Sequence, residues 1–242
     1  MDAFEIQVYD GTADAQRAIG LELHANAFIR GARSAESPQL PLDRQGHLTL
    51  EPSYGLFSWW ELGGYLQTAI IGDDGTFRWG GAKLRSKFVT PPGWHAHLRF
   101  GLNVELAYLP PAFDRNEWGM ELRPIAAWEN DHWLFVINPI VSLSLAGPDA
   151  PAGPVFEPCA SAAYKFGERV SLGFEYYGEL GPFSSVLPVA EQEHVLFGVV
   201  NVLAIKNVEI NVGFGHGLTA ASSPFVAKMI LGYTWEHFVR KR

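Results

Sequence analysis

Cysteine is almost absent from this 242-residue chain, which contains only Cys159. One thiol cannot form an intrachain disulfide or supply a zinc site built from several thiolates. Charged residues are also scarce, at 18% where about 25% is usual. The chain lacks the run of about 18 apolar residues that a transmembrane helix requires. Its net charge of −8 excludes nucleic acid as an expected partner, because phosphate binding requires clustered Lys and Arg.

What the chain does contain is a sustained alternation of apolar and polar side chains. In the stretch 97–108, HLRFGLNVELAY, Leu, Phe, Val and Tyr occupy every second position, and small or polar residues occupy the others. The same pattern recurs at 59–71, 171–179 and 208–215. A period of two places one type of side chain on each face of a β-strand, and no segment has a convincing helical period. The sequence therefore predicts an all-β fold.

Breaks rich in Gly, Pro and Asp divide this alternation into about twelve strands. Most are about 10–14 residues long, whereas strands of soluble domains average about 5–6 and a tilted bilayer-spanning strand needs about 9–11. We therefore predict a transmembrane antiparallel up-and-down β-barrel. The predicted strands are 18–30, 47–56, 59–71, 78–90, 96–109, 117–129, 132–145, 155–166, 169–180, 193–204, 207–218 and 224–236.

Short and long connections alternate between the predicted strands, as is typical of outer-membrane barrels with short periplasmic turns and longer extracellular loops. An even strand number places both termini at the short-turn rim. The short connections are expected at 57–58, 129–131, 167–168 and 206–207, with a slightly longer one at 91–95. The longer loops are expected at 31–46, 110–116, 147–154 and 181–192.

Most of the eight tryptophans lie beside the predicted short turns or near the C-terminus. Amphipathic rings prefer the interfaces of a bilayer. We predict an interfacial aromatic girdle made of Trp59, Trp60, Trp94, Trp128, Trp133 and Trp235. Trp79 and Trp118 fall near the opposite rim.

The last predicted strand, AKMILGYTW, resembles the C-terminal strand signal of Gram-negative outer-membrane β-barrel proteins, with Lys228, Gly232, Tyr233 and Trp235 at the matching positions. The segments FEIQVYDG, LELHANAF, LRSKFVTPPGW and ELRPIAAWEN are similar to uncharacterised outer-membrane transporters, loosely of the phenol-degradation MetA-like kind. This resemblance covers most of the chain and implies a bacterial outer-membrane location, with lipid as a partner. It carries no catalytic signature.

The ends of the chain fall outside the predicted barrel, 18–238. Residues 1–17 contain an alternating stretch, Phe4–Tyr9, for which we expect a lumen plug or a short added strand, with a periplasmic strand or a disordered lead as alternatives. No signal peptide is recognisable at the N-terminus, so an outer-membrane location implies that one has been removed or replaced. Residues 239–242 form a basic tail.

The polar face of the strands carries the candidate lumen residues. We expect a basic wall around the fourth and fifth strands to face an acidic wall on the eighth, ninth and eleventh, and this field to orient a small polar or amphipathic solute in a narrow channel. The alternative is that these charges pair and close the lumen. The candidates are Lys83, Arg85, Lys87, Arg99, Asn103, Glu105, Glu121, Arg123, Glu157, Glu175, Glu179 and Glu209.

No cofactor, metal or catalytic site is expected. His95 and His97 could share a face at the rim, but two ligands without a third are a weak metal site. His24 and Cys159 are interpreted as lumen packing. A lipid-acting enzyme would need a serine beside His216, and no such serine is evident.

Two further alternatives concern the barrel as a whole. It could be a closed structural outer-membrane protein without transport. It could also be a soluble β-barrel that binds a hydrophobic ligand, in which the apolar stripe of each strand faces inward. Four prolines within predicted strands, Pro52, Pro124, Pro139 and Pro158, oppose a regular ladder because proline lacks the N–H donor. Bulges or a local break in pairing could accommodate them.

Overall fold

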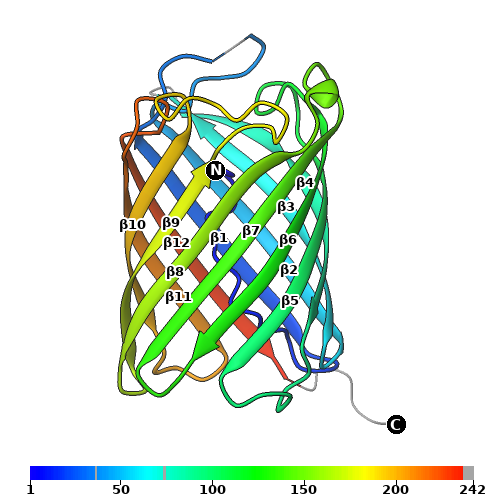
Figure 1. Cartoon of the computed structure of the whole chain (residues 1–242), viewed down its shortest axis with the longest axis vertical. Coiled ribbons are helices and arrows are strands. Elements are labelled where there is room, and N and C mark those ends of the chain that lie inside the picture. The colour runs from blue at the N-terminus through cyan, green and yellow to red at the C-terminus, as the bar shows by residue number, and fades with distance from the viewer. Residues whose placement is uncertain (36, 73–74, 237–242) are drawn as a thin grey trace.

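The computed structural model describes residues 1–35, 37–72 and 75–236, and its dominant feature is a barrel of twelve strands (Figure 1). No helix in these ranges is long and apolar enough to cross a membrane. The elements are β1 (Ile19–Arg30), β2 (Gln45–Phe57), β3 (Trp60–Ile71), β4 (Thr76–Val89), β5 (Leu98–Tyr108), β6 (Trp118–Glu129), β7 (Trp133–Ala146), the single-turn 3-10 helix η1 (Ala150–Ala152), β8 (Val155–Phe166), β9 (Val170–Glu179), β10 (Glu193–Val202), β11 (Val208–Gly217) and β12 (Phe225–Trp235).

Each strand pairs antiparallel with its sequence neighbours, and β1 pairs with β12 to close the barrel. Closure leaves no exposed sheet edge, which is the condition for a sheet to exist in lipid. The predicted antiparallel up-and-down barrel is therefore confirmed, and each described strand begins and ends within two residues of its prediction. The predicted tail 239–242 lies outside the described residues.

The two faces of the wall are reversed relative to a soluble protein. On β4, Leu84 faces outward and is 69% exposed, whereas Lys83 and Arg85 face the interior and are 6% and 4% exposed. Outward Leu, Phe, Ile and Val side chains recur on all sides of the barrel, as expected for a wall that meets hydrocarbon. The alternative of a soluble barrel with its apolar stripe inward is therefore wrong.

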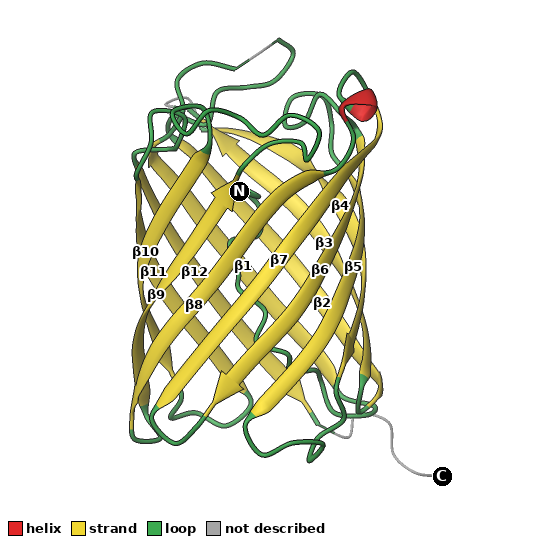
Figure 2. Ribbon diagram, viewed as in Figure 1, coloured by secondary structure: helices red, strands yellow, loops and turns green. Residues whose placement is uncertain are grey.

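The two rims differ in their connections. One rim, called the short-turn rim here, has tight turns at 58–59, 130–132 and 167–169. The other, the long-loop rim, carries the longer segments, including 109–117 and 180–192, and lies uppermost in Figure 2. β1 begins and β12 ends at the short-turn rim, where Ile19 pairs with Trp235.

Aromatic side chains stack on the outside of the short-turn rim. Trp59 and Trp60 stack with Phe57 and Phe88, with ring centroids 5.5–6.4 Å apart. Rings at this level suit the boundary between hydrocarbon and water. The other candidate girdle residues pack against aromatic neighbours edge-on or tilted: Trp94 with Phe100, Trp128 with Phe135, Trp133 with Tyr164, and Trp235 with Tyr233.

The prolines are accommodated by a local break in hydrogen bonding and not by a shift of register. Pro139 of β7 lies opposite Pro158 of β8. Between β6 and β7 the pairing stops at Leu122–Val141 and resumes in the same register at Ala126–Ile137, so that Pro124 falls in the gap. A row across three strands therefore lacks ladder donors, while the alternation of faces is preserved.

Candidate solute site in the barrel lumen

The N-terminal segment, residues 1–17, lies inside the barrel (Figure 1). The α-amino group of Met1 donates to Glu179 Oε2 and Glu193 Oε2, at 3.1 and 3.2 Å, where β9 ends and β10 begins at the long-loop rim. The prediction that both termini lie at the short-turn rim is therefore wrong for Met1. The chain runs back down the lumen to reach β1, and residues 1–17 contain no strand.

The first six residues fill the long-loop half of the lumen with apolar contacts. The Phe4 ring packs edge-on against His47 and Phe113, with centroids 4.5 and 5.3 Å away. Ile6 is completely buried in a cluster with Phe28 and Phe197, among others. These contacts fill this half of the lumen with the side chains of residues 1–6.

Buried ion pairs hold the same segment to the wall. Lys83 Nζ binds Asp2 Oδ2 at 2.5 Å, Glu5 Oε2 at 3.2 Å and Glu105 Oε2 at 3.0 Å. Arg123 Nη1 donates to the main-chain oxygen of Gln7 at 3.1 Å. A cation surrounded in this way satisfies the requirement that buried charges be paired and hydrogen-bonded.

Tyr9 lies midway along the segment and contacts both the buried charges of the lumen and Asn138, which adjoins Pro139. Its hydroxyl lies 2.8 Å from Glu5 Oε1 and 2.5 Å from the Tyr65 hydroxyl, and the Arg123 guanidinium is 4.5 Å from its ring centroid. Its main-chain N–H and C=O both bond to the side-chain amide of Asn138, at 2.8 and 2.9 Å. Asn138 lies next to Pro139, so the segment is anchored where the wall lacks ladder bonds.

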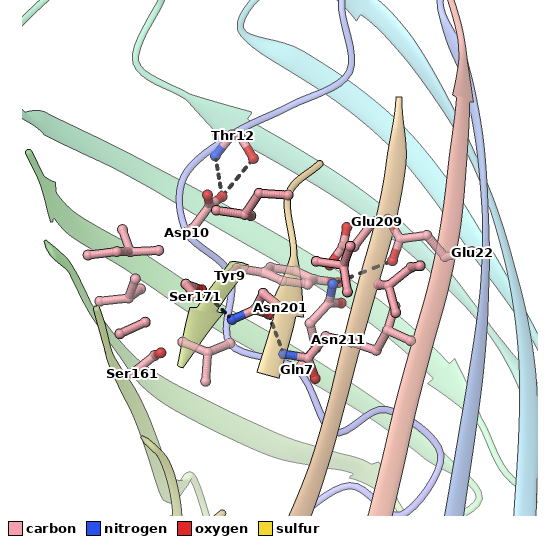
Figure 3. A pocket seen from close by; sticks show the side chains of 18 of the residues that line it. Gln7, Tyr9, Asp10, Thr12, Glu22, Ser161, Ser171, Asn201, Glu209 and Asn211 are labelled. Carbon is pink, nitrogen blue, oxygen red and sulfur yellow. Dashed lines mark hydrogen bonds between the residues drawn. The ribbon is translucent and has the colours of Figure 1, made fainter. Parts of the chain in front are cut away.

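The short-turn half of the lumen is hollow. A cavity of about 860 Å³ extends from Gln7 to turn residues such as Glu168, so it opens toward the short-turn rim. Figure 3 shows polar side chains of the N-terminal segment and of the wall around this space, among them Asp10, Asn201 of β10 and Glu209 of β11. Ten Asp and Glu residues and four Lys and Arg residues line it within the described ranges. The cavity is therefore polar and acidic.

The predicted basic wall is not an unpaired wall facing acids across the lumen. Arg85 of β4 donates to Glu61 of the neighbouring strand β3 and to Glu51 of β2, the next strand but one, each at 2.6 Å. Lys87 binds Glu61 at 3.0 Å, and Arg99 binds Glu129. The expectation of a transverse field between separate basic and acidic walls is corrected, because carboxylates of nearby strands and of residues 1–17 neutralise the basic side chains locally.

The predicted acidic residues fall into different surroundings. Glu175 accepts a bond from Lys228, and Glu179 pairs with the Met1 amine. Glu121 pairs with Arg123 at 2.7 Å. Glu157 lines a small space of about 20 Å³ near Met1. Asn103 donates to Glu105 at 2.7 Å, and Glu209 faces the large cavity.

Several lumen residues were missed by sequence reasoning. The alternation already placed Glu61 and Tyr65 on a polar face, and it would have found Glu51 by the same rule. Asp2, Glu5 and the role of Asn138 could not be found, since nothing local in the sequence shows which strand a non-strand segment will contact.

The other histidines considered above and Cys159 do not line the cavity of about 860 Å³, whereas the two carboxylates beside His24 do. At the rim, His95 Nδ1 accepts bonds from the main chain of His97 and Leu98, and His97 Nδ1 contacts the carbonyl of Glu129 at 2.9 Å. His216 Nδ1 contacts the carbonyl oxygen of Pro224 at 3.0 Å. Cys159 is a free thiol buried in the lumen.

No protein-family model matches the chain, and no curated protein matches it. Among solved structures, an outer membrane channel from Pseudomonas putida F1 superposes with a TM-score of 0.64 at 14% identity, covering 96% of this chain and 100% of that one. KdgM porin and NanC porin each superpose with a TM-score of 0.57 at 10% and 7% identity, covering 90% of this chain and 99% of theirs. Likeness at these identities shows the fold, which is that of the outer-membrane β-barrels.

Proposed function

We propose that this protein is an outer-membrane channel that passes a small polar or amphipathic solute through its lumen. The observation that carries the proposal is the cavity of about 860 Å³, which opens at one rim and ends at the N-terminal segment. Its volume falls within the roughly 300–1,000 Å³ of small-molecule sites. The names of the structural relatives, two porins and an outer membrane channel, support the same function. The barrel would lie in the bacterial outer membrane with its short turns in the periplasm.

Passage through the barrel requires residues 1–6 to move. They contribute no strand, and the twelve strands close without them. Displacing the segment therefore breaks side-chain contacts but leaves the ladder between β1 and β12 intact. The charges it would expose, including Lys83 and Glu105, would then line a hydrated path for a polar solute.

A planar-bilayer experiment tests this function. The intact protein is compared with a variant lacking residues 1–9, and each is first checked for heat-modifiable mobility on gels as a sign of a folded barrel. We expect small or rare conductance steps from the intact protein and large, steady ones from the shortened barrel. The variant Leu84→Ala, at an outward-facing residue outside the cavity, serves as the control and should behave as the intact protein does.

The contrary outcome is equally clear. A folded, shortened barrel that conducts no more than the intact protein, and admits no small sugar in liposome swelling, would contradict a channel. Such a result would favour a closed structural barrel, in which the pairing of lumen charges serves only stability.

A further inference from the structure

One cluster in the wall of the cavity combines a histidine with carboxylates. Glu22 and His24 lie on the inner face of β1, and Glu51 lies opposite Glu22 on β2. His24 Nε2 is 2.9 Å from Glu51 Oε2 and 3.6 Å from Glu22 Oε2. One ligand atom from each of the three residues lies within 4.8 Å of the others. Glu22 and Glu51 line the cavity, so a solute can reach the cluster from the short-turn rim.

The spacing of these atoms suits a small divalent ion. Around a tetrahedral ion with metal–donor distances of about 2.1 Å, donors lie about 3.4 Å apart. The two separations measured from His24 Nε2 lie on either side of that value. Imidazole and carboxylate together form a donor set typical of Zn²⁺ and related transition-metal ions.

Charge balance around the cluster also favours a cation. Among the described residues, Glu22, Glu51, Glu61 and Glu209 face two Lys or Arg side chains, Arg85 and Lys87, and His24 lies beside Glu22 and Glu51. With all four carboxylates ionised and His24 neutral, two negative charges are left over, which one divalent ion would compensate. Glu209 has no ion pair or hydrogen bond with any residue that the structure describes.

A glycine allows Glu209 to approach. Gly232 lies between Glu22 and Glu209 in the register of β1, β12 and β11. A Cβ at Gly232 would lie 2.9 Å from Glu22 Cγ and 3.2 Å from Glu209 Cβ. The missing side chain therefore leaves room for two carboxylates to lean together, a costly arrangement unless a positive charge joins them.

Protonation of His24 is a poor substitute for a metal. The ring is completely buried, and its Nδ1 has no hydrogen-bond partner. A doubly protonated imidazole would leave that buried N–H without a hydrogen-bond partner among the described residues, which is costly. The neutral ring can instead present the Nε2 lone pair toward the two carboxylates.

We propose that Glu22, His24 and Glu51 bind a divalent transition-metal ion, and Glu209 lies across Gly232 from Glu22 on the same inner face. Glu51 binds through Oε2, while its Oε1 accepts a bond from Arg85 at 2.6 Å. A ligating carboxylate held from behind in this way is typical of metal sites. The site is independent of whether the barrel conducts.

Calorimetric titration of the full-length, EDTA-treated protein in detergent with ZnCl₂ tests the site. We expect one saturable equivalent, with affinity reduced about tenfold or more in Glu22→Gln and in His24→Gln. Glu168→Gln, which removes a cavity carboxylate at the turn 167–169, is the matched control and should leave affinity unchanged. Co²⁺ should give a visible absorption band that His24→Gln abolishes.

Rim histidines are a competing source of Zn²⁺ binding, so a His95→Ala/His97→Ala variant is titrated in parallel. Binding that survives in this variant supports the site in the wall. Binding that is lost there but retained in Glu22→Gln and His24→Gln overturns the proposal, as does the absence of saturable binding in the intact, folded barrel. Heat-modifiable mobility of each variant verifies that the barrel has formed.

Discussion

The two halves of the lumen solve the same electrostatic problem in different ways. In the long-loop half, Lys83 is 6% exposed and is surrounded by three carboxylates with apolar side chains close by. In the short-turn half, Lys165 pairs with Glu129 beside an open cavity. The first arrangement depends on complete pairing, because water cannot replace a lost partner. In the second arrangement, water from the cavity can solvate a charge that loses its partner.

This difference teaches which charges fix the structure and which are available to a solute. Charges in the long-loop half hold the N-terminal segment to the wall. Each of the three described carboxylates around Lys83 forms an ion pair with it. In the short-turn half, acidic side chains outnumber basic ones in the cavity lining, and Glu209 is one acidic residue without an ion pair among the described residues. The cavity in the short-turn half would therefore determine which solutes pass, and the N-terminal segment in the long-loop half would determine whether the channel is open.

The largest effect is expected from removing the buried cation. Lys83→Met removes the ion pair of buried Glu105 and leaves Glu5 only its longer pair with Arg123, at 3.7 Å, and should lower the free energy of unfolding by about 3–5 kcal/mol. Lys165→Met, its counterpart in the hollow half, should cost about 1 kcal/mol or less, because water can solvate Glu129. Urea titrations followed by heat-modifiable mobility measure both. Equal losses in the two variants would remove the distinction between the halves.

An intermediate effect is expected from crowding the packed half without changing any charge. A Cβ at Gly80 would meet the Phe4 ring at 2.4 Å. Gly80→Ala should therefore cost about 1–3 kcal/mol through overpacking and should make residues 1–17 easier for a protease to cleave. A Cβ at Gly198 would meet nothing within 4 Å, so Gly198→Ala is the control. Identical cleavage rates would show that Phe4 is not held tightly.

The smallest effect concerns ion preference in the hollow half. Because acidic residues outnumber basic ones in the cavity lining, the barrel lacking residues 1–9 should pass K⁺ in preference to Cl⁻. Glu209→Gln should reduce that preference slightly, since it removes one unpaired charge among many. Reversal potentials across a salt gradient measure the change. A preference for Cl⁻ would indicate that the cavity does not control permeation.

The sequence allowed the wall of the barrel to be predicted almost completely. Strand identity depends on the alternation within each segment and on the turn residues beside it, both of which are local properties. The inward orientation of Lys83 and Arg85 followed from the same alternation. The prolines within strands were visible in the sequence, but their alignment in one row, with Pro139 opposite Pro158, is set by the pairing register and was not.

The contents of the lumen could not be predicted in the same way. Lys83 contacts Asp2 across 81 positions, and Lys228 donates to the main chain of Ile6 across 222. No periodicity relates such residues, because residues 1–17 follow the shape of a cavity and not a ladder. The expected field between opposite walls was wrong for this reason: the nearest carboxylates came from nearby strands and from the N-terminal segment.

The most direct test of the account measures where water reaches the N-terminal segment. In a Cys159→Ala background, single cysteines are placed at Ile6, which is completely buried, and at Thr12, which is exposed and lines the cavity. The folded protein in detergent is treated with a charged thiol reagent, and the two reaction rates are compared. We expect rapid labelling at Thr12→Cys and protection at Ile6→Cys. Equal, rapid labelling at both positions would contradict a lumen that is closed in one half and hydrated in the other.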